Sequence, residues 1–186
     1  MNVTITVSEP SLDFIRNSIS IFFPENTPGY GFSAPMKLTQ TIYAKNEAFA
    51  KDLPVGEIRV SLFESPEYGN CFNIGTVTAE GTYKTTGLDI GNAANFVFVM
   101  ELLGLKEFQK IQITENRTEY RGINIFFQEV EGLGSFVRYE KKIDPSVISE
   151  KEVRDELIAI ATQLHGDITG RLSDGNFAKM LAGGGR

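Results

Sequence analysis

Few residues of this chain can do acid–base or metal chemistry. Its 186 residues include one histidine, His165, and one cysteine, Cys71. A zinc site made from Cys and His needs three or four ligands, so such a site is excluded. A nucleophile–histidine–acid arrangement would have to use His165, because histidine is the usual general base at neutral pH. His165 falls in the last turn of a predicted helix, a common place for a structural histidine, and we assign it no catalytic role.

Glycine motifs for phosphate binding are incomplete. The chain has no GxxxxGK[ST] loop, and Gly29-Tyr30-Gly31 and Gly132-Leu133-Gly134 each lack the third glycine of a dinucleotide fingerprint. Asp174-Gly175-Asn176 has the residue types of a calcium loop without the remaining ligands, and is better explained as a turn and helix cap. The sequence therefore predicts no cofactor and no metal.

Carboxylate chemistry is the catalytic alternative that remains. Glu64 with Glu67, or Glu129 with Glu131, would suit an acid–base pair or a magnesium-dependent hydrolase. Nothing distinguishes these four residues from the other acids, which number 24 in all and mostly solvate a surface.

An aromatic loop is the main candidate for ligand binding. Residues 24–35 are rich in proline and glycine and carry Tyr30 and Phe32. Beside a strand that bears Lys37 and Tyr43, these rings would suit a small ligand or the stacked bases of a single-stranded nucleic acid. The competing interpretation is that Phe32 closes the end of the hydrophobic core.

Charge limits the choice of partner. The net charge is −6 and the sequence pI is about 4.9, which disfavours nucleic acids and anionic membranes because their binders concentrate Lys and Arg. The first ten residues show no signal-peptide pattern, and a single cysteine fits a reducing compartment. We expect a cytoplasmic protein with no transmembrane segment.

The most apolar stretch is GNAANFVFVMELLGL, residues 91–105. Its apolar core is about ten residues long, against roughly 20 needed to cross a bilayer. Capping residues before it and Gly104 after it predict a buried helix over 92–103. Glu101 would then lie at the exposed rim; the alternative is a carboxylate facing a pocket.

Alternating patterns predict strands in most of the remaining chain. Expected strands cover residues 3–7, 38–42, 58–62, 72–83, 109–114, 119–130 and 135–143. Short connections between them favour an antiparallel meander. A capping box at Ser149 and Glu152 begins a helix that Gly166 ends. The sequence predicts an α+β fold with about seven strands in a mainly antiparallel β body.

The carboxyl-terminal part has a different pattern. We expect residues 1–143 to form the β body and residues 144–186 to form a helical arm that is no independent domain. Glycines break this arm into pieces too short to be stable alone, so its apolar side chains need a surface to cover. The expected interface residues are Leu164, Ile168, Leu172, Phe177, Met180 and Leu181.

These observations together predict a non-enzymatic structural or interaction protein. It would self-associate as a homo-oligomer or dock into a larger assembly of protein subunits, such as a virion, through the arm. Two alternatives remain open: a ligand- or single-strand-binding module that uses Tyr30 and Phe32, and the carboxylate-based, metal-dependent hydrolase.

Overall fold

The structure, a computed structural model, describes residues 2–22, 31–66, 69–77, 79, 83–90, 93–144, 146–173 and 175–182. The chain divides into two compact units. The first contains Met1–Pro35, Thr114–Val130 and Gly134–Gly175, and the second contains Met36–Ile113, Glu131–Leu133 and Asn176–Arg186. Among the described residues, no helix is long and apolar enough to cross a membrane.

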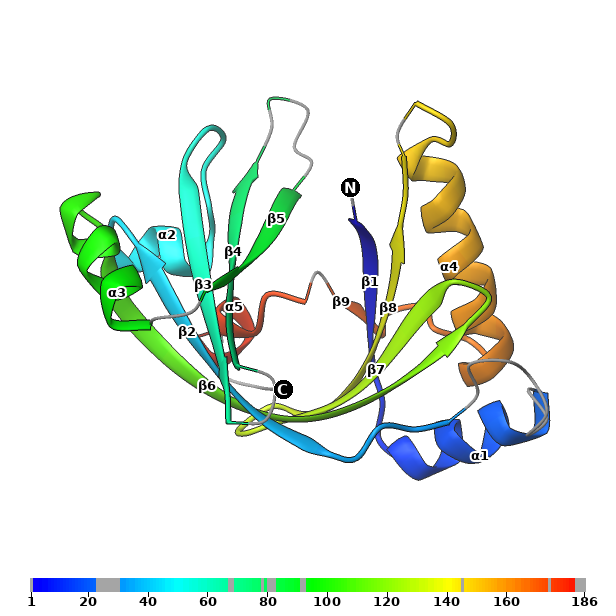
Figure 1. Ribbon diagram of the computed structural model, residues 1–186. Coiled ribbons are helices and arrows are strands. Elements are labelled where there is room, and N and C mark those ends of the chain that lie inside the picture. The colour runs from blue at the N-terminus through cyan, green and yellow to red at the C-terminus, as the bar shows by residue number, and fades with distance from the viewer. Residues whose placement is uncertain are drawn as a thin grey trace. The chain divides into compact units, whose positions relative to one another are not determined.

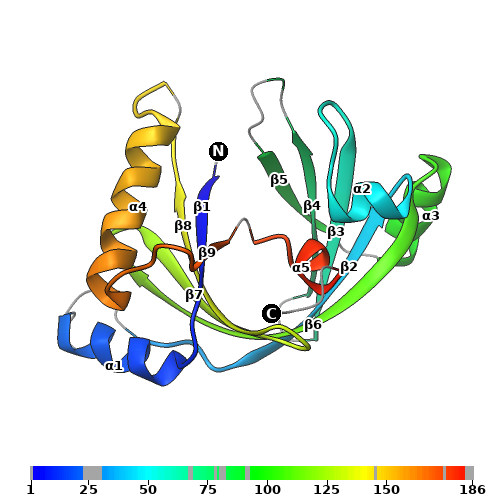
Figure 2. The ribbon, with the colours of Figure 1, turned by 180° about the vertical axis from the view of Figure 1, so that it is seen from behind.

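The first unit is an antiparallel sheet with two helices on one face (Figures 1 and 2). Its strands run in the order β6-β7-β8-β1-β9. They are the second half of β6 (Lys106–Tyr120), then β7 (Ile123–Val130), β8 (Gly134–Lys142), β1 (Asn2–Ser8) and β9 (Leu172–Ser173). The helices are α1 (Leu12–Phe22) and α4 (Glu150–His165). Since β1 pairs with β8, the amino-terminal strand lies inside the sheet.

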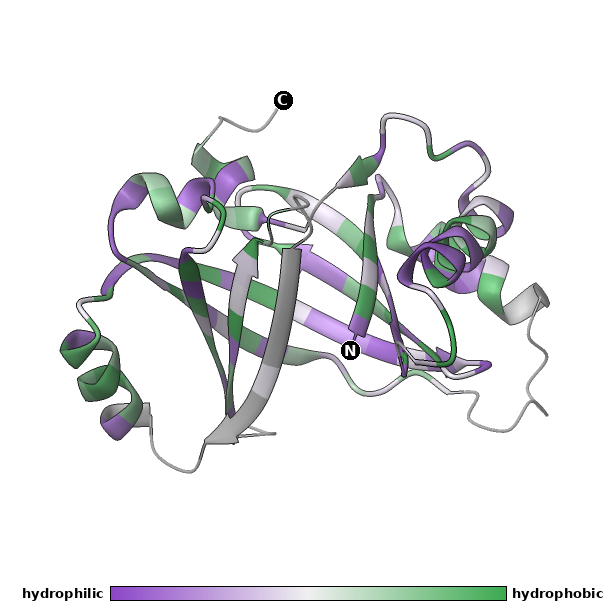
Figure 3. Cartoon of the chain, turned by 90° about the horizontal axis from the view of Figure 1, so that it is seen from above, coloured by the Kyte–Doolittle hydropathy of each residue, from purple (hydrophilic) through white to green (hydrophobic). Residues whose placement is uncertain are grey.

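Alternation along the strands separates the two faces of this sheet. In β1, Val3, Ile5 and Val7 are buried in one core with Tyr139 of β8 and Leu157 of α4. Successive strand residues point to opposite faces, so the residues between them face away from the helices. Figure 3 shows this alternation of hydrophobic and hydrophilic residues along the strands.

Helix α4 begins and ends as the sequence predicts. Ser149 Oγ accepts a hydrogen bond from Glu152 N at 3.2 Å, and Glu152 Oε2 accepts one from Ser149 N at 3.0 Å. This reciprocal pair is the predicted capping box, and it satisfies two amides that have no partner inside the helix. Lys141 of β8 also donates to Glu156 of α4 at 2.7 Å, which ties the helix to the sheet.

In the second unit the strands run in the order β5-β4-β3-β2-β6. Its strands are β2 (Met36–Ala44), β3 (Ile58–Ser65), β4 (Gly69–Val77), β5 (Tyr83–Ile90) and the first half of β6. Its helices are α2 (Glu47–Lys51), α3 (Ala93–Leu102) and α5 (Phe177–Ala182). Phe96 and Met100 of α3 pack on Tyr43, Val60 and Leu62 of the sheet.

The predicted α+β fold and antiparallel β body are confirmed, as is the helix within 91–105. Gly104 ends this helix with a φ of 70°, a conformation that glycine adopts without strain. Glu101 is exposed at its rim. The same helix leaves Phe98 and Leu102 exposed, so it is buried on one side only.

Two predicted strand boundaries are wrong. The break expected at Asn116-Arg117 does not occur, because β6 runs without interruption from Lys106 to Tyr120. The turn lies instead at Arg121-Gly122, where φ is 51° and 74°, as a two-residue hairpin turn requires. The strand expected over 72–83 is two strands, β4 and β5, which pair from Asn70↔Ile90 to Val77↔Tyr83.

Residues on both sides of position 143 share one core. Leu164 and Ile168, from the expected arm, are buried with Ile5 of β1 in the first unit. The division into a β body over residues 1–143 and an arm over residues 144–186 stays a prediction.

Candidate active site

A polar surface covers the sheet face of the first unit that points away from α1 and α4. The strand register places the residues of this surface in rows across β1, β8 and β7. One row is Thr4, Glu140 and Asn124, and the next is Thr6, Arg138 and Phe126. Residues in the same row of neighbouring strands point to the same face. We call this surface the polar face.

Three side chains of the polar face form a cluster. Gln128 Nε2 of β7 donates to Glu115 Oε2 of β6 at 2.7 Å. Arg138 Nη2 of β8 forms an ion pair with the same carboxylate oxygen at 3.6 Å. Glu115 is 5% exposed and Gln128 is 3% exposed, whereas the Arg138 side chain is 27% exposed. The cation therefore reaches the surface while the carboxylate and the amide lie beneath it.

The aromatic ring of Phe126 fixes the position of the guanidinium. Arg138 Cζ lies 4.1 Å from the centroid of that ring, a cation–π contact that restricts a long side chain. Arginine held flat in this way presents a planar fork of donors. Such a fork suits the oxygens of a phosphate or a carboxylate.

The cluster is incomplete in its hydrogen bonds. Among the described residues, Arg138 Nε and Gln128 Oε1 are buried and have no hydrogen-bond partner. Unpaired buried polar atoms are rare in folded proteins, since each costs about 1–3 kcal/mol. One free donor and one free acceptor thus lie beside a buried carboxylate. A polar ligand that brings an acceptor to Arg138 and a donor to Gln128 would complete the arrangement.

A second ionic cluster lies on the other face of the same sheet. His165 Nδ1 and Glu9 Oε2 are 2.6 Å apart, and His165 Nε2 and Tyr139 Oη are 2.7 Å apart. A carboxylate accepts hydrogen bonds, so His165 donates from Nδ1 to Glu9 and its Nε2 accepts from the Tyr139 hydroxyl. Arg171 donates to the same Glu9 oxygen from Nη2.

The second cluster is closed to substrates. Tyr139 is 0% exposed and the His165 side chain is 0% exposed. Burial lowers the pKa of His165, although its hydrogen bond to Glu9 acts in the opposite direction. Burial, and next the Glu9 charge, raise the pKa of Tyr139 above its ordinary value. These groups hold Arg171 against the end of β1, where Arg171 Nε also donates to Ser8 O at 3.1 Å.

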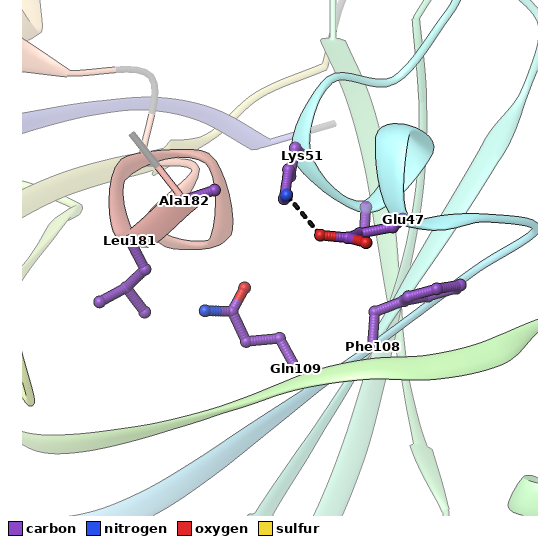
Figure 4. A pocket seen from close by; sticks show the side chains of 7 residues that line it. Glu47, Lys51, Phe108, Gln109, Leu181 and Ala182 are labelled. Carbon is purple, nitrogen blue, oxygen red and sulfur yellow. Dashed lines mark hydrogen bonds and ion pairs between the residues drawn. The ribbon is translucent and has the colours of Figure 1, made fainter. Parts of the chain in front are cut away.

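A small pocket lies in the second unit (Figure 4). Its volume is about 280 Å³. Its lining residues are Glu47, Ala50, Lys51, Phe108, Gln109, Leu181 and Ala182. Lys51 donates a hydrogen bond to Glu47, which lowers the pKa of that carboxyl. Lys51 and Glu47 already pair with each other at an exposed position. This pocket therefore offers a ligand fewer unpaired polar groups than the polar face does.

The aromatic residues predicted for ligand binding are used in packing. Phe32 lies edge-on against Phe127, with ring centroids 5.4 Å apart, as the core-closing interpretation expects. Tyr43 is 4% exposed and lies against Phe96 of α3. Lys37 is exposed. Tyr30 lies outside the described residues.

The predicted interface residues have different environments. Leu164, Ile168 and Phe177 are buried within the chain, Met180 and Leu181 are partly buried, and Leu172 is 39% exposed. Their burial in an assembly stays a prediction, as does a homo-oligomer.

The four carboxylates singled out from the sequence form no metal site in the part of the chain that the structure describes. Glu129 and Glu131 are exposed and Glu64 is partly exposed. Glu67 lies outside the described residues.

Sequence reasoning missed the residues of the polar face. The signal was present in β8, where Arg138, Glu140 and Lys142 alternate with Val137 and Tyr139. Charged residues that alternate with buried ones show that a sheet has a polar face. Nothing in the sequence showed that Glu115 and Gln128 meet Arg138, because that depends on the register of three strands.

The chain resembles solved structures only in its fold. No known protein family and no curated protein matches its sequence. It is similar to a Vibrio parahaemolyticus protein provisionally assigned as an adenylate cyclase, with a TM-score of 0.74 and 13% identity over 97% of both chains. A Bacillus halodurans protein with the same provisional assignment gives a TM-score of 0.54 and 9% identity, over 90% of this chain and 91% of that one.

A third likeness is to a chain of the Mediator head module from Schizosaccharomyces pombe. Its TM-score is 0.58 at 10% identity, over 88% of this chain and 94% of that chain. At these identities the likenesses show the fold alone, since one fold hosts several functions.

The predictions of a non-enzymatic structural protein and of no enzymatic activity are contradicted. The overturning finding is the likeness to two chains provisionally assigned as adenylate cyclases. The reasoning failed because it gave most weight to the missing histidine, cysteine and phosphate-loop motifs. It kept carboxylate chemistry as an alternative but did not consider Arg138, Glu115 and Gln128.

Proposed function

We propose that this protein is an enzyme that binds a nucleoside triphosphate on the polar face and cleaves its phosphate chain. The observation that carries the proposal is the incomplete cluster of Arg138, Glu115 and Gln128. It combines a restrained guanidinium with a buried carboxylate and two unpaired polar atoms. The likeness to two provisionally assigned adenylate cyclases supports this substrate class.

Arg138 has the role of holding the phosphate chain. The guanidinium nitrogens of Arg138 that reach the surface donate to phosphate oxygens, which carry the charge that grows as the chain is cleaved. Phe126 holds the guanidinium, so little side-chain freedom is lost on binding.

Glu115 has the role of the base. In cyclisation, the ribose 3′-oxygen forms a bond to the α-phosphorus, the bond between that phosphorus and the bridging oxygen breaks, and pyrophosphate leaves. The 3′-hydroxyl proton passes to the Glu115 carboxylate. Gln128 Nε2 keeps that carboxylate oriented, and Gln128 Oε1 accepts from a hydroxyl of the substrate.

Magnesium commonly accompanies nucleoside triphosphates, held by one or two carboxylates and the phosphates themselves. The described residues contain no group of three metal-ligating side chains, so a site built entirely by the protein is not among them. The proposal assigns no step to a metal ion.

Product analysis tests the proposal. The full chain is incubated with ATP and magnesium, and the nucleotides are separated by chromatography. We expect cyclic AMP with pyrophosphate; ADP or AMP would identify hydrolysis at the same site. Arg138→Met and Glu115→Gln should each lower the rate by about 100-fold or more.

Matched controls make the result specific. Arg154→Met and Glu129→Gln alter an exposed arginine and an exposed glutamate away from the polar face, and should retain full activity. Equal rates in all four variants, or no turnover of any nucleoside triphosphate by the wild type, would contradict the proposal.

A further inference from the structure

Helix α3 presents an apolar surface to solvent. Phe98 is 60% exposed, Val99 45%, Leu102 70% and Leu103 57%. We call these four residues the outer face of α3. They form two pairs four residues apart, Phe98 with Leu102 and Val99 with Leu103, the residue that follows the helix. Phe96 and Met100, which hold the helix on its sheet, lie on the side opposite Phe98 and Leu102.

This exposure is unusual for a helix on the surface of a globular unit. A surface helix normally carries polar residues on the side opposite its core contacts. Most exposed large hydrophobic residues of a protein are scattered singly, whereas a contiguous patch marks an interaction site. Four of the exposed large hydrophobic residues in the described chain lie within Phe98–Leu103.

A carboxylate borders the outer face. Glu101 lies on the same helix, next to Leu102, and is exposed. It makes no ion pair within the described residues, while Glu107 pairs with Lys110 at 3.3 Å. On the inner side of the helix, burial raises the pKa of Tyr43, and the charges of Glu107, Glu64 and Glu101 raise it further.

We infer that the outer face of α3 binds a basic amphipathic helix of another protein, one with apolar residues on one side and Lys or Arg beside them. The apolar ridges of two such helices interdigitate. The cations of the partner then meet Glu101. Charge disfavours the two other possible partners, a second copy of this chain and an anionic membrane. A second copy would bring like charges together, since each chain has a net charge of −6. An anionic membrane would repel the same negative charge.

Two synthetic peptides test this inference. Both are amphipathic helices with leucine on one side; one carries lysine on the other side and the second carries glutamate. Binding to the full-length protein is measured by fluorescence anisotropy of labelled peptide. We expect the leucine–lysine peptide to bind at least about 10-fold more tightly than the leucine–glutamate peptide, with an affinity that falls as salt is added.

Substitutions locate the binding surface. Replacing Phe98 and Leu102 together by Ser should weaken binding of the leucine–lysine peptide by about 10- to 100-fold. The matched control is Val55→Ser, which changes another exposed apolar residue of the same unit (59% exposed). This variant should bind the peptide as tightly as the wild type does. Glu101→Lys provides an independent variant and should shift the preference toward the leucine–glutamate peptide.

Three outcomes would overturn the inference. One is equal binding of the leucine–lysine peptide by wild type and by the Phe98/Leu102 variant. Another is a dimer of the wild type, seen by light scattering, that the same variant abolishes, because a second copy would then cover α3. The third is binding of the wild type, but not the variant, to phosphatidylcholine vesicles. The inference is supported by the peptide result together with the absence of vesicle binding and of any dimer that depends on Phe98 and Leu102.

Discussion

Arg138 and Tyr139 are neighbours in β8, yet each belongs to a different ionic cluster. Tyr139 points toward α4 and ends a chain of hydrogen bonds through His165 and Glu9 to Arg171. Arg138 points to the polar face and meets Glu115 and Gln128. The cluster of His165, Glu9 and Tyr139, which we call the closed cluster, satisfies its ring nitrogens and its hydroxyl. The cluster of Arg138, Glu115 and Gln128, which we call the open cluster, leaves two buried polar atoms unpaired.

The difference indicates which cluster is structural and which is functional. A satisfied buried network makes a fold rigid and has nothing left to offer a ligand. An unsatisfied one costs stability, and a bound ligand can supply the missing partners. Substitutions in the closed cluster should therefore lower the free energy of unfolding, whereas substitutions in the open cluster should weaken ligand binding.

The largest effect on stability is expected from Glu9→Ala. This change leaves the His165 ring and the Arg171 guanidinium without their shared acceptor. Removing one partner of a buried ionic network costs about 3–5 kcal/mol, reduced here because Arg171 is 28% exposed. Urea denaturation followed by circular dichroism measures the loss. A change below about 0.5 kcal/mol would show that the closed cluster does not hold the first unit together.

Tyr139→Phe should have the next largest effect. It removes one hydroxyl and leaves His165 Nε2 buried without a donor, at a cost of about 1–3 kcal/mol in the free energy of unfolding. The neighbouring change Arg138→Met should cost less, because its side chain reaches solvent and its ion pair is long. If Arg138→Met were the more damaging of the two, the assignment of the clusters would be reversed.

Acid should weaken the closed cluster over a defined range of pH. The pKa of His165 is lowered in the folded protein from its ordinary value of 6.5, chiefly by burial. As the pH falls through that value, the unfolded chain binds a proton that the folded chain does not. The free energy of unfolding should therefore decrease, by up to about 1.4 kcal/mol per pH unit, until the folded protein also binds the proton.

His165→Gln is the control for this pH dependence. It should be less stable than the wild type at pH 8, with a smaller further loss between pH 6.5 and pH 5. The same slope in wild type and variant would assign the acid sensitivity to other groups.

The smallest effect on stability is expected at the open cluster. Replacing Arg138, Glu115 and Gln128 together by Met removes both members of the ion pair and an amide whose oxygen has no partner. Apolar replacement of a buried polar group is often neutral or stabilising, by up to about 1–4 kcal/mol. Thermal unfolding should give a midpoint at or above that of the wild type, while nucleotide binding is lost. Strong destabilisation would make this cluster a structural one.

The sequence allowed the elements to be predicted better than the site. Capping residues and alternation are local signals, so the helix after Ser149 and the strands around Val3 and Val137 follow from short windows. The hairpin turn at Arg121-Gly122 was missed because a positive φ at arginine has no strong sequence signal. Both clusters join residues more than ten positions apart. The strand register brings Glu115, Gln128 and Arg138 together, and the packing of α4 on the sheet brings His165 to Glu9.

The most direct test of the central claim is nucleotide-induced stabilisation of the open cluster. The thermal midpoint is measured with and without excess ATP for the wild type, for Arg138→Met and for its neighbour Tyr139→Phe. ATP at about 100 times its dissociation constant adds roughly 2.7 kcal/mol to the free energy of unfolding. We predict that ATP raises the midpoint of the wild type and of Tyr139→Phe but not that of Arg138→Met. An equal rise in all three proteins, or no rise in the wild type, would contradict the account.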